Sequence, residues 1–150
     1  MKVSIAMATF NGARHLQAQL DSFVSQTCLP DELVACDDGS SDATVATLEA
    51  FARHALFPVV VLRNAATLGY VRNFERALSA CRGDIVFLSD QDDAWFPDKI
   101  ARMVEALDAR AELQVVIADM VLTDGQLQPT PHTQLRNILD IGMPASSYVA

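Results

Sequence analysis

The fold is decided first by residues 3–12, which read Val-Ser-Ile-Ala-Met-Ala-Thr-Phe-Asn-Gly. Apolar and β-branched residues run here directly into a polar Asn-Gly pair, the pattern of a buried strand that ends in a turn. The run is too short for a secretion signal or a membrane-spanning helix. We therefore expect a first buried strand over Val3–Thr9.

Outward from this strand, short β-branched runs alternate with amphipathic helical stretches. Further strands are predicted at 33–36, 59–62, 85–88 and 115–122. This alternation predicts an α/β fold with a mostly parallel sheet flanked by helices. We expect one such domain over residues 1–122, followed by an irregular segment over 123–150.

Composition narrows the function classes. The chain has 150 residues, 51% of them hydrophobic, so it can bury a core and is not a disordered protein. Its 19 acidic and 11 basic residues give a net charge of -8, which argues against nucleic acid or an anionic membrane surface as partner. Its 3 cysteines are far apart in the sequence, and no two of them form a C-x-x-C motif, so neither a zinc site nor a disulfide framework is indicated. Reduced thiols fit a cytoplasmic protein.

Polar residues follow three of the predicted strands. They occupy residues 9–12, 37–42 and 89–93. Ligands of open parallel sheets bind outside the carboxyl ends of the strands, so these segments are expected to share one rim of the domain.

The acidic run after the fourth strand is the strongest chemical signal. Asp90, Asp92 and Asp93 lie almost adjacent in sequence, and two carboxylates ~4 Å apart repel by about 4 kcal/mol at an effective dielectric near 20. A divalent cation with oxygen ligands, such as Mg²⁺ or Mn²⁺, would offset that repulsion and could bridge to a diphosphate. The simpler interpretation is a solvated acidic turn with one Asp capping the next helix.

Two other pairs leave alternatives open. Asp37-Asp38 fits a turn and helix cap as well as a carboxylate that accepts a hydrogen bond from a base or a ribose. Trp95-Phe96 could line a sugar pocket, but anchoring of the loop in the core is favoured.

The ordered set of segments resembles the family 2 glycosyltransferases, whose nucleotide-binding half has the GT-A fold. The resemblance covers residues 3 to about 122 and is carried by segments 3–12, 16–27, 31–34, 37–42, 64–73, 83–95 and 97–99. The form Ser-Asp-Gln-Asp-Asp-x-Trp at 89–95 resembles the branch that builds bacterial surface polysaccharides, often as rhamnosyltransferases.

The resemblance implies roles for individual residues. The nucleotide would be bordered by Ala8, Thr9, Asn11, Asp38, Arg72 and Asp92. Asp38 would meet the base or ribose, and Arg72 the diphosphate. The metal, Mg²⁺ or Mn²⁺, would be held by residues among Asp90, Asp92 and Asp93. The resemblance leaves open which of these three carboxylates contacts the metal.

The implied chemistry is inverting transfer of a sugar from a nucleoside diphosphate, with dTDP or UDP favoured, to a saccharide or lipid-linked acceptor. The resemblance places the general base of such enzymes beyond residue 150, so we expect either a truncated chain or a divergent short member. In either case the chain would supply the donor-binding half and bind donor without turnover. We expect a cytoplasmic location, at most peripheral to the membrane, and leave a homodimer open.

Three other function classes are weighed. A phosphoacceptor receiver domain would need its acidic pair after the first strand, where Thr9-Phe10-Asn11 stands. A sugar-1-phosphate nucleotidyltransferase would need a Gly-rich basic loop there. A non-catalytic nucleotide-sugar-binding or assembly module that lacks the acceptor half remains the alternative.

Overall fold

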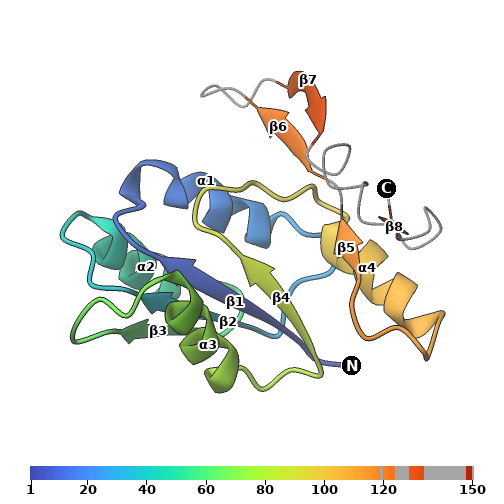
Figure 1. The fold of residues 1–150 in the computed structure, drawn as a ribbon, viewed down its shortest axis with the longest axis horizontal. Coiled ribbons are helices and arrows are strands. Elements are labelled where there is room, and N and C mark those ends of the chain that lie inside the picture. Colours follow the sequence, from blue (N-terminus) through green and yellow to red (C-terminus); the bar gives the residue numbers. More distant parts are fainter. Residues whose placement is uncertain (119, 124–128, 134–147, 150) are drawn as a thin grey trace. The chain divides into compact units, whose positions relative to one another are not determined.

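The computed structural model describes residues 1–118, 120–123, 129–133 and 148–149. It divides into two compact units, Met1–Ile100 and Ala101–Ala150. The first unit holds a four-stranded sheet in the order β3-β2-β1-β4 (Figure 1). Its elements in chain order are β1 (Val3–Thr9), α1 (Ala13–Val24), β2 (Glu32–Asp37), α2 (Thr44–Ala52), β3 (Val59–Arg63), α3 (Tyr70–Ala80) and β4 (Ile85–Ser89).

All three strand pairings in this sheet are parallel. The predicted α/β architecture is therefore confirmed. β1 is one of the two inner strands, and it is buried along its whole length because it has a neighbour on each side and helices on both faces.

The two faces of the sheet are covered by different helices. On one face, α3 contributes Ala77 to a buried cluster with Ala6, Val34 and Cys36. On the other face, Gln19 of α1 donates from Nε2 to Ser89 Oγ at 2.8 Å. The side chains alternate along each strand, so each face receives every second residue.

The strand order creates a switch point between β1 and β4. The chain moves outward from β1 through β2 to β3, and then returns through α3 to the other side of β1. Loops that leave β1 and β4 at such a point run in opposite directions, and the crevice between them is where open α/β sheets bind ligands. The loops in question are residues 10–12 and 90–93.

The second unit differs from the expectation of one strand over residues 115–122. Helix α4 (Lys99–Asp108) leads into it, and two short strands, β5 (Ile117–Ala118) and β6 (Val121–Thr123), replace the single strand. β5 pairs with β8 (Tyr148–Val149) and β6 pairs with β7 (Pro129–Thr133), so the two halves of the predicted strand have different partners. The predicted domain boundary after residue 122 stays a prediction, as does the irregular segment 123–150, most of which lies outside the described residues.

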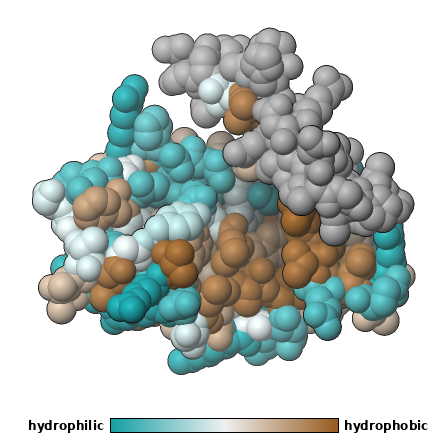
Figure 2. Space-filling model, in the orientation of Figure 1, coloured by the Kyte–Doolittle hydropathy of each residue, from teal (hydrophilic) through white to brown (hydrophobic). Residues whose placement is uncertain are grey.

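Some apolar surface is exposed on the first unit. Val86 of β4 packs against the cluster beneath α3, whereas Leu88, two residues further along the same strand face, is 59% exposed. Val71 on α3 is 66% exposed. Figure 2 shows apolar side chains gathered over β4 in this view. Within the part of the chain that is described, no helix has the length and apolar character to cross a membrane.

Candidate functional site

The loops after β1 and β2 are joined by side-chain hydrogen bonds. Thr9 donates from its hydroxyl to Asp37 Oδ1 at 3.0 Å. The Asn11 N–H donates to Ser40 Oγ at 2.8 Å, and Asn11 Oδ1 accepts from the Ser41 N–H at 2.9 Å. Asn11 adopts a left-handed backbone conformation with φ 48°, which asparagine tolerates better than most residues. The predicted residues Thr9 and Asn11 are thus part of one tightly joined rim.

Asp38 is buried and holds the loop that leads into α3. Its Oδ1 accepts from the Leu68 N–H at 2.8 Å and from Asn64 Nδ2 at 2.6 Å, and its Oδ2 accepts from the Gly69 N–H at 2.9 Å. Burial by itself raises the pKa of Asp38, but these hydrogen bonds outweigh it and hold the pKa below its usual value. A carboxylate has about four acceptor sites, so Asp38 retains capacity for one further donor. Its contact with a base or ribose stays a prediction.

A buried polar network surrounds the Asn64 side chain that bonds to Asp38. Asn64 also donates to Asn73 Oδ1 at 2.9 Å and accepts from the Arg76 guanidinium. Asn73 donates in turn to the Cys36 carbonyl at 2.8 Å. The network explains why polar side chains are buried here, because each is hydrogen-bonded. These roles were not predictable from the sequence, since nothing in the spacing of the residues indicates which backbone groups they reach.

The acidic run lies at the carboxyl end of β4, beside the first turn of α3. The Tyr70 hydroxyl donates to Asp90 Oδ2 at 3.5 Å. Burial raises the pKa of Asp90, and repulsion from Asp93 and Asp92 raises it further. Burial and Asp92 likewise raise the pKa of Asp93, against the opposing effect of the Lys99 ammonium. The carboxylates therefore concentrate negative charge, as the sequence predicts.

The donor set suits a hard divalent cation. Among the described residues, no three His, Cys, Asp or Glu side chains are grouped as a complete ligand set. Mg²⁺ and similar ions need only one or two carboxylates when substrate phosphates supply further oxygens. A cation there would also relieve the repulsion that, after burial, raises the pKa of Asp90 and Asp93. Metal binding by Asp90, Asp92 and Asp93 stays a prediction.

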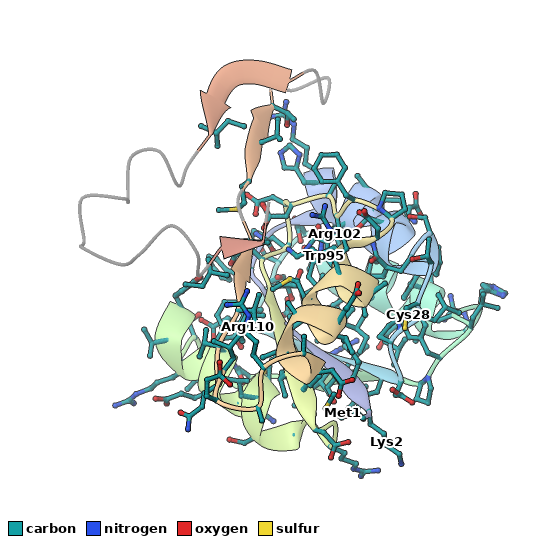
Figure 3. All side chains as sticks on the ribbon, turned by 90° about the vertical axis from the view of Figure 1, so that its right-hand side faces the viewer. Met1, Lys2, Cys28, Trp95, Arg102 and Arg110 are labelled. Carbon is teal, nitrogen blue, oxygen red and sulfur yellow. The ribbon has the colours of Figure 1, made fainter. Side chains whose placement is uncertain are left out.

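The remaining predicted residues occupy different environments. Ala8 is buried near the end of β1, and Arg72 is exposed on the first turn of α3. Trp95 is 6% exposed and packs edge-on against Phe23, with ring centroids 4.8 Å apart, so the core-anchoring interpretation is confirmed for it. Phe96 is 64% exposed, so the same interpretation is wrong for Phe96. In Figure 3 Trp95 lies above Met1 and Lys2, which mark the start of the chain.

A further contact of the rim was also not predictable from the sequence. Gln91, the uncharged member of the acidic run, bonds with its side-chain amide to the backbone of Phe10. The loops after β1, β2, β3 and β4 are thereby linked into one continuous rim at the carboxyl edge of the sheet.

Comparison with known proteins agrees with this geometry. A family model described as "Glycosyl transferase family 2" matches residues 4–143. The chain belongs to this family.

Two curated relatives illustrate the membership. Over 123 residues the chain is 30% identical to EpsE of Bacillus subtilis (strain 168), which is described as a "Putative glycosyltransferase"; the match covers 82% of the chain and 44% of EpsE. It is 30% identical over 145 residues to the succinoglycan biosynthesis protein ExoO of Rhizobium meliloti (strain 1021), covering 95% of the chain and 41% of ExoO. The chain thus spans less than half the length of these relatives.

Solved structures establish the GT-A fold. S. aureus TarS 1-349 in complex with UDP superposes with a TM-score of 0.75 at 23% identity, over 88% of this chain and 38% of TarS. The mannosyltransferase PcManGT from Pyrobaculum calidifontis, in complex with GDP-Man and Mn²⁺, gives a TM-score of 0.69 at 24% identity, over 83% of this chain and 36% of that one. The predicted GT-A fold is therefore confirmed.

Proposed function

We propose that this chain supplies the donor-binding half of an enzyme that transfers a sugar from a nucleoside diphosphate to an acceptor hydroxyl. The observation that carries the proposal is the linked rim at the carboxyl edge of the sheet, which joins the loop of Asp38 to the acidic run at Asp90, Asp92 and Asp93. Family membership, together with the UDP and GDP-Man held by the TarS and PcManGT structures, supports the same class of donor.

The rim offers different chemistry along its length. On the β1–β2 side, Thr9, Asn11 and Asp38 would border a nucleoside. On the β4 side, Asp90, Asp92 and Asp93 would hold Mg²⁺ or Mn²⁺, with Asp92 also toward the ribose. Arg72 on the exposed start of α3 is assigned to the diphosphate.

Catalysis would proceed by in-line attack of the acceptor hydroxyl on the anomeric carbon, with inversion. The bound cation would supply charge stabilisation to the departing diphosphate. The chain's own residues orient the nucleoside through the rim and keep the diphosphate at a fixed distance from the acidic run. A general base must accept the proton of the acceptor hydroxyl, and we assign no described residue to that role.

The acceptor class we propose is a saccharide or a lipid-linked saccharide of a bacterial surface polysaccharide. The succinoglycan assignment of ExoO supports this class. The dTDP- and UDP-linked sugars remain the favoured donors. A homodimer and a cytoplasmic location remain predictions.

A thermal-shift screen tests the proposal. The protein is heated with UDP-, dTDP-, GDP- and CDP-sugars, each with and without Mn²⁺. A ligand that binds only the folded state at 100 times its Kd stabilises it by about 2.7 kcal/mol. We expect one donor to raise the midpoint, and to do so more with Mn²⁺. The absence of a shift with every donor would contradict the proposal.

A further inference from the structure

Gln91 clamps the backbone of the loop after β1. Its Oε1 accepts from the Phe10 N–H at 2.8 Å, and its Nε2 donates to the Phe10 carbonyl at 3.1 Å. One primary amide thus pairs with both polar backbone groups of one residue, as a neighbouring strand would. The two residues are 81 positions apart in the chain, so this contact is made entirely by the fold.

Gly12 provides the room for this clamp. A Cβ on Gly12 would lie 2.1 Å from Gln91 Oε1 and 2.3 Å from its Cδ, distances that no real contact allows. The backbone of Gly12 does not itself require glycine, because its φ is -102°. A larger residue could be accommodated only if the Gln91 amide swung away, which would break both bonds to Phe10.

The clamp crosses the switch point of the sheet. Phe10 belongs to the loop after β1, which Thr9 and Asn11 join to the β2 loop. Gln91 lies in the acidic run after β4, between Asp90 and Asp92. The two loops leave the sheet in opposite directions at this point, so their separation is set by contacts between them. Gln91 supplies two such contacts from within the acidic run.

We propose that Gln91 is a positioning residue that sets the distance between the nucleoside side and the diphosphate side of the site. The inference rests on the proposed function. A nucleoside diphosphate must engage both sides at once, and a preformed spacing spares it the entropy of ordering the two loops. A nucleoside alone, or pyrophosphate alone, engages one side and does not need the spacing.

The test compares these three kinds of ligand by calorimetric titration. The probes are UDP and dTDP with Mn²⁺, uridine and thymidine, and inorganic pyrophosphate with Mn²⁺. In Gln91→Ala we expect the affinity for the nucleoside diphosphate to fall about tenfold, the scale of two modest neutral hydrogen bonds. Affinities for the nucleoside and for pyrophosphate should change less than about twofold, within the scatter of surface substitutions. Gln91→Met, which keeps the length but not the hydrogen bonds, should behave like Gln91→Ala.

A substitution at Gly12 provides a second way to displace the Gln91 amide. Gly12→Ala should lower nucleoside diphosphate affinity as much as Gln91→Ala does, because it displaces the same amide. The double variant should be no worse than Gln91→Ala alone, since the clash disappears with the side chain. Gln17→Ala removes a surface amide on α1 that bonds to Asp21, and it should leave every affinity unchanged.

The results of these titrations distinguish a failure of the proposed function from a failure of the positioning role of Gln91. If the wild type binds none of the nucleoside diphosphates, the proposed function fails and this inference fails with it. If the wild type binds a nucleoside diphosphate and Gln91→Ala binds it equally well, the proposed function stands and the positioning role of Gln91 is refuted. Equal losses for all three kinds of probe, or multiplied losses in the double variant, would show a general structural role instead of positioning and would also refute it.

Discussion

Replacing Asp38 by Asn tests whether this carboxylate stabilises the loop that leads into α3. The substitution conserves shape but exchanges an acceptor-only carboxylate for an amide. If the amide oxygen takes the place of Oδ1, it keeps the bonds from Leu68 and Asn64. The amide nitrogen then faces the Gly69 N–H, which stands 2.9 Å from Oδ2 in the native protein. Two donors are brought together and one hydrogen bond is lost.

The magnitude follows from the three bonds. Hydrogen bonds to charged groups contribute about 1.5–3 kcal/mol and neutral ones about 0.5–1.5 kcal/mol. Leu68 and Gly69 are exposed, so water recovers part of any loss and the cost of the lost bond falls below the range for charged groups. The lost bond costs about 1 kcal/mol, and the weakening of the other two costs about 1 kcal/mol more. We therefore expect the free energy of unfolding to fall by about 2 kcal/mol at pH 7.

Urea unfolding followed by tryptophan fluorescence measures this loss. Trp95 is the single tryptophan and packs against Phe23 in the core, so its emission reports unfolding of the first unit. Asp21→Asn is the matched control, because Asp21 is exposed and accepts one bond from Gln17 on the helix surface. It should cost less than about 0.5 kcal/mol. A loss in Asp38→Asn no larger than in this control would refute the reasoning.

The pH dependence provides a second check on Asp38. Its pKa is lowered in the folded state. The stabilisation it supplies is therefore fully present above the ordinary carboxyl pKa of about 3.9 and is lost as the pH falls through the lower folded value. The difference in stability between wild type and Asp38→Asn should shrink on acidification below about pH 4. A difference that stays constant would contradict the role of the charge.

Three further predictions concern the same rim. Asp93→Asn should weaken Mn²⁺-dependent binding of a nucleoside diphosphate at least about tenfold, or 1.4 kcal/mol, and an unchanged calorimetric titration would remove Asp93 from the metal site. Gly69→Ala should lower the thermal midpoint, because Gly69 has φ 87° and ψ 161°. This conformation costs residues other than glycine about 1–3 kcal/mol. A midpoint equal to that of the wild type would show that the loop relaxes freely. Burial, with repulsion inside the acidic run, raises the pKa of Asp90 and Asp93. Without a divalent cation, their contribution to stability is present below the ordinary carboxyl pKa and is lost as the pH rises through the higher folded values. The urea midpoint of the double variant Asp90→Asn/Asp93→Asn should therefore rise relative to that of the wild type as the pH rises from 4 to 7. A difference in midpoint that does not depend on pH would count against this explanation.

Much of the fold was predictable because its signals are local. The strand at Val3–Thr9 and the helices between the strands follow from apolar periodicity, and strand–helix alternation predicts a parallel sheet. The expected strand over 115–122 was wrong in its continuity. Its apolar pattern indicates a strand, but strand continuity depends on pairing partners, and here the two halves pair with different strands.

The candidate site was predictable only in outline. The carboxyl ends of parallel strands share one edge, so the convergence of Thr9, Asp38 and the acidic run follows from topology. The resemblance to family 2 glycosyltransferases, now confirmed as membership, narrowed the residues further. Contacts such as Asn64 with Asp38 were not predictable, because they depend on the path of each loop.

By itself, the sequence determined the order of the strands and helices in the first unit and the acidic character of the rim. These are properties of neighbouring residues, and periodicity and charge express them directly. Only the tertiary structure decided that Asp38 holds the start of α3 and that Gln91 closes on Phe10 in the space left by Gly12. Such bonds join segments dozens of residues apart, and a side-chain amide or carboxylate takes its partner from whichever backbone the fold brings within about 3 Å.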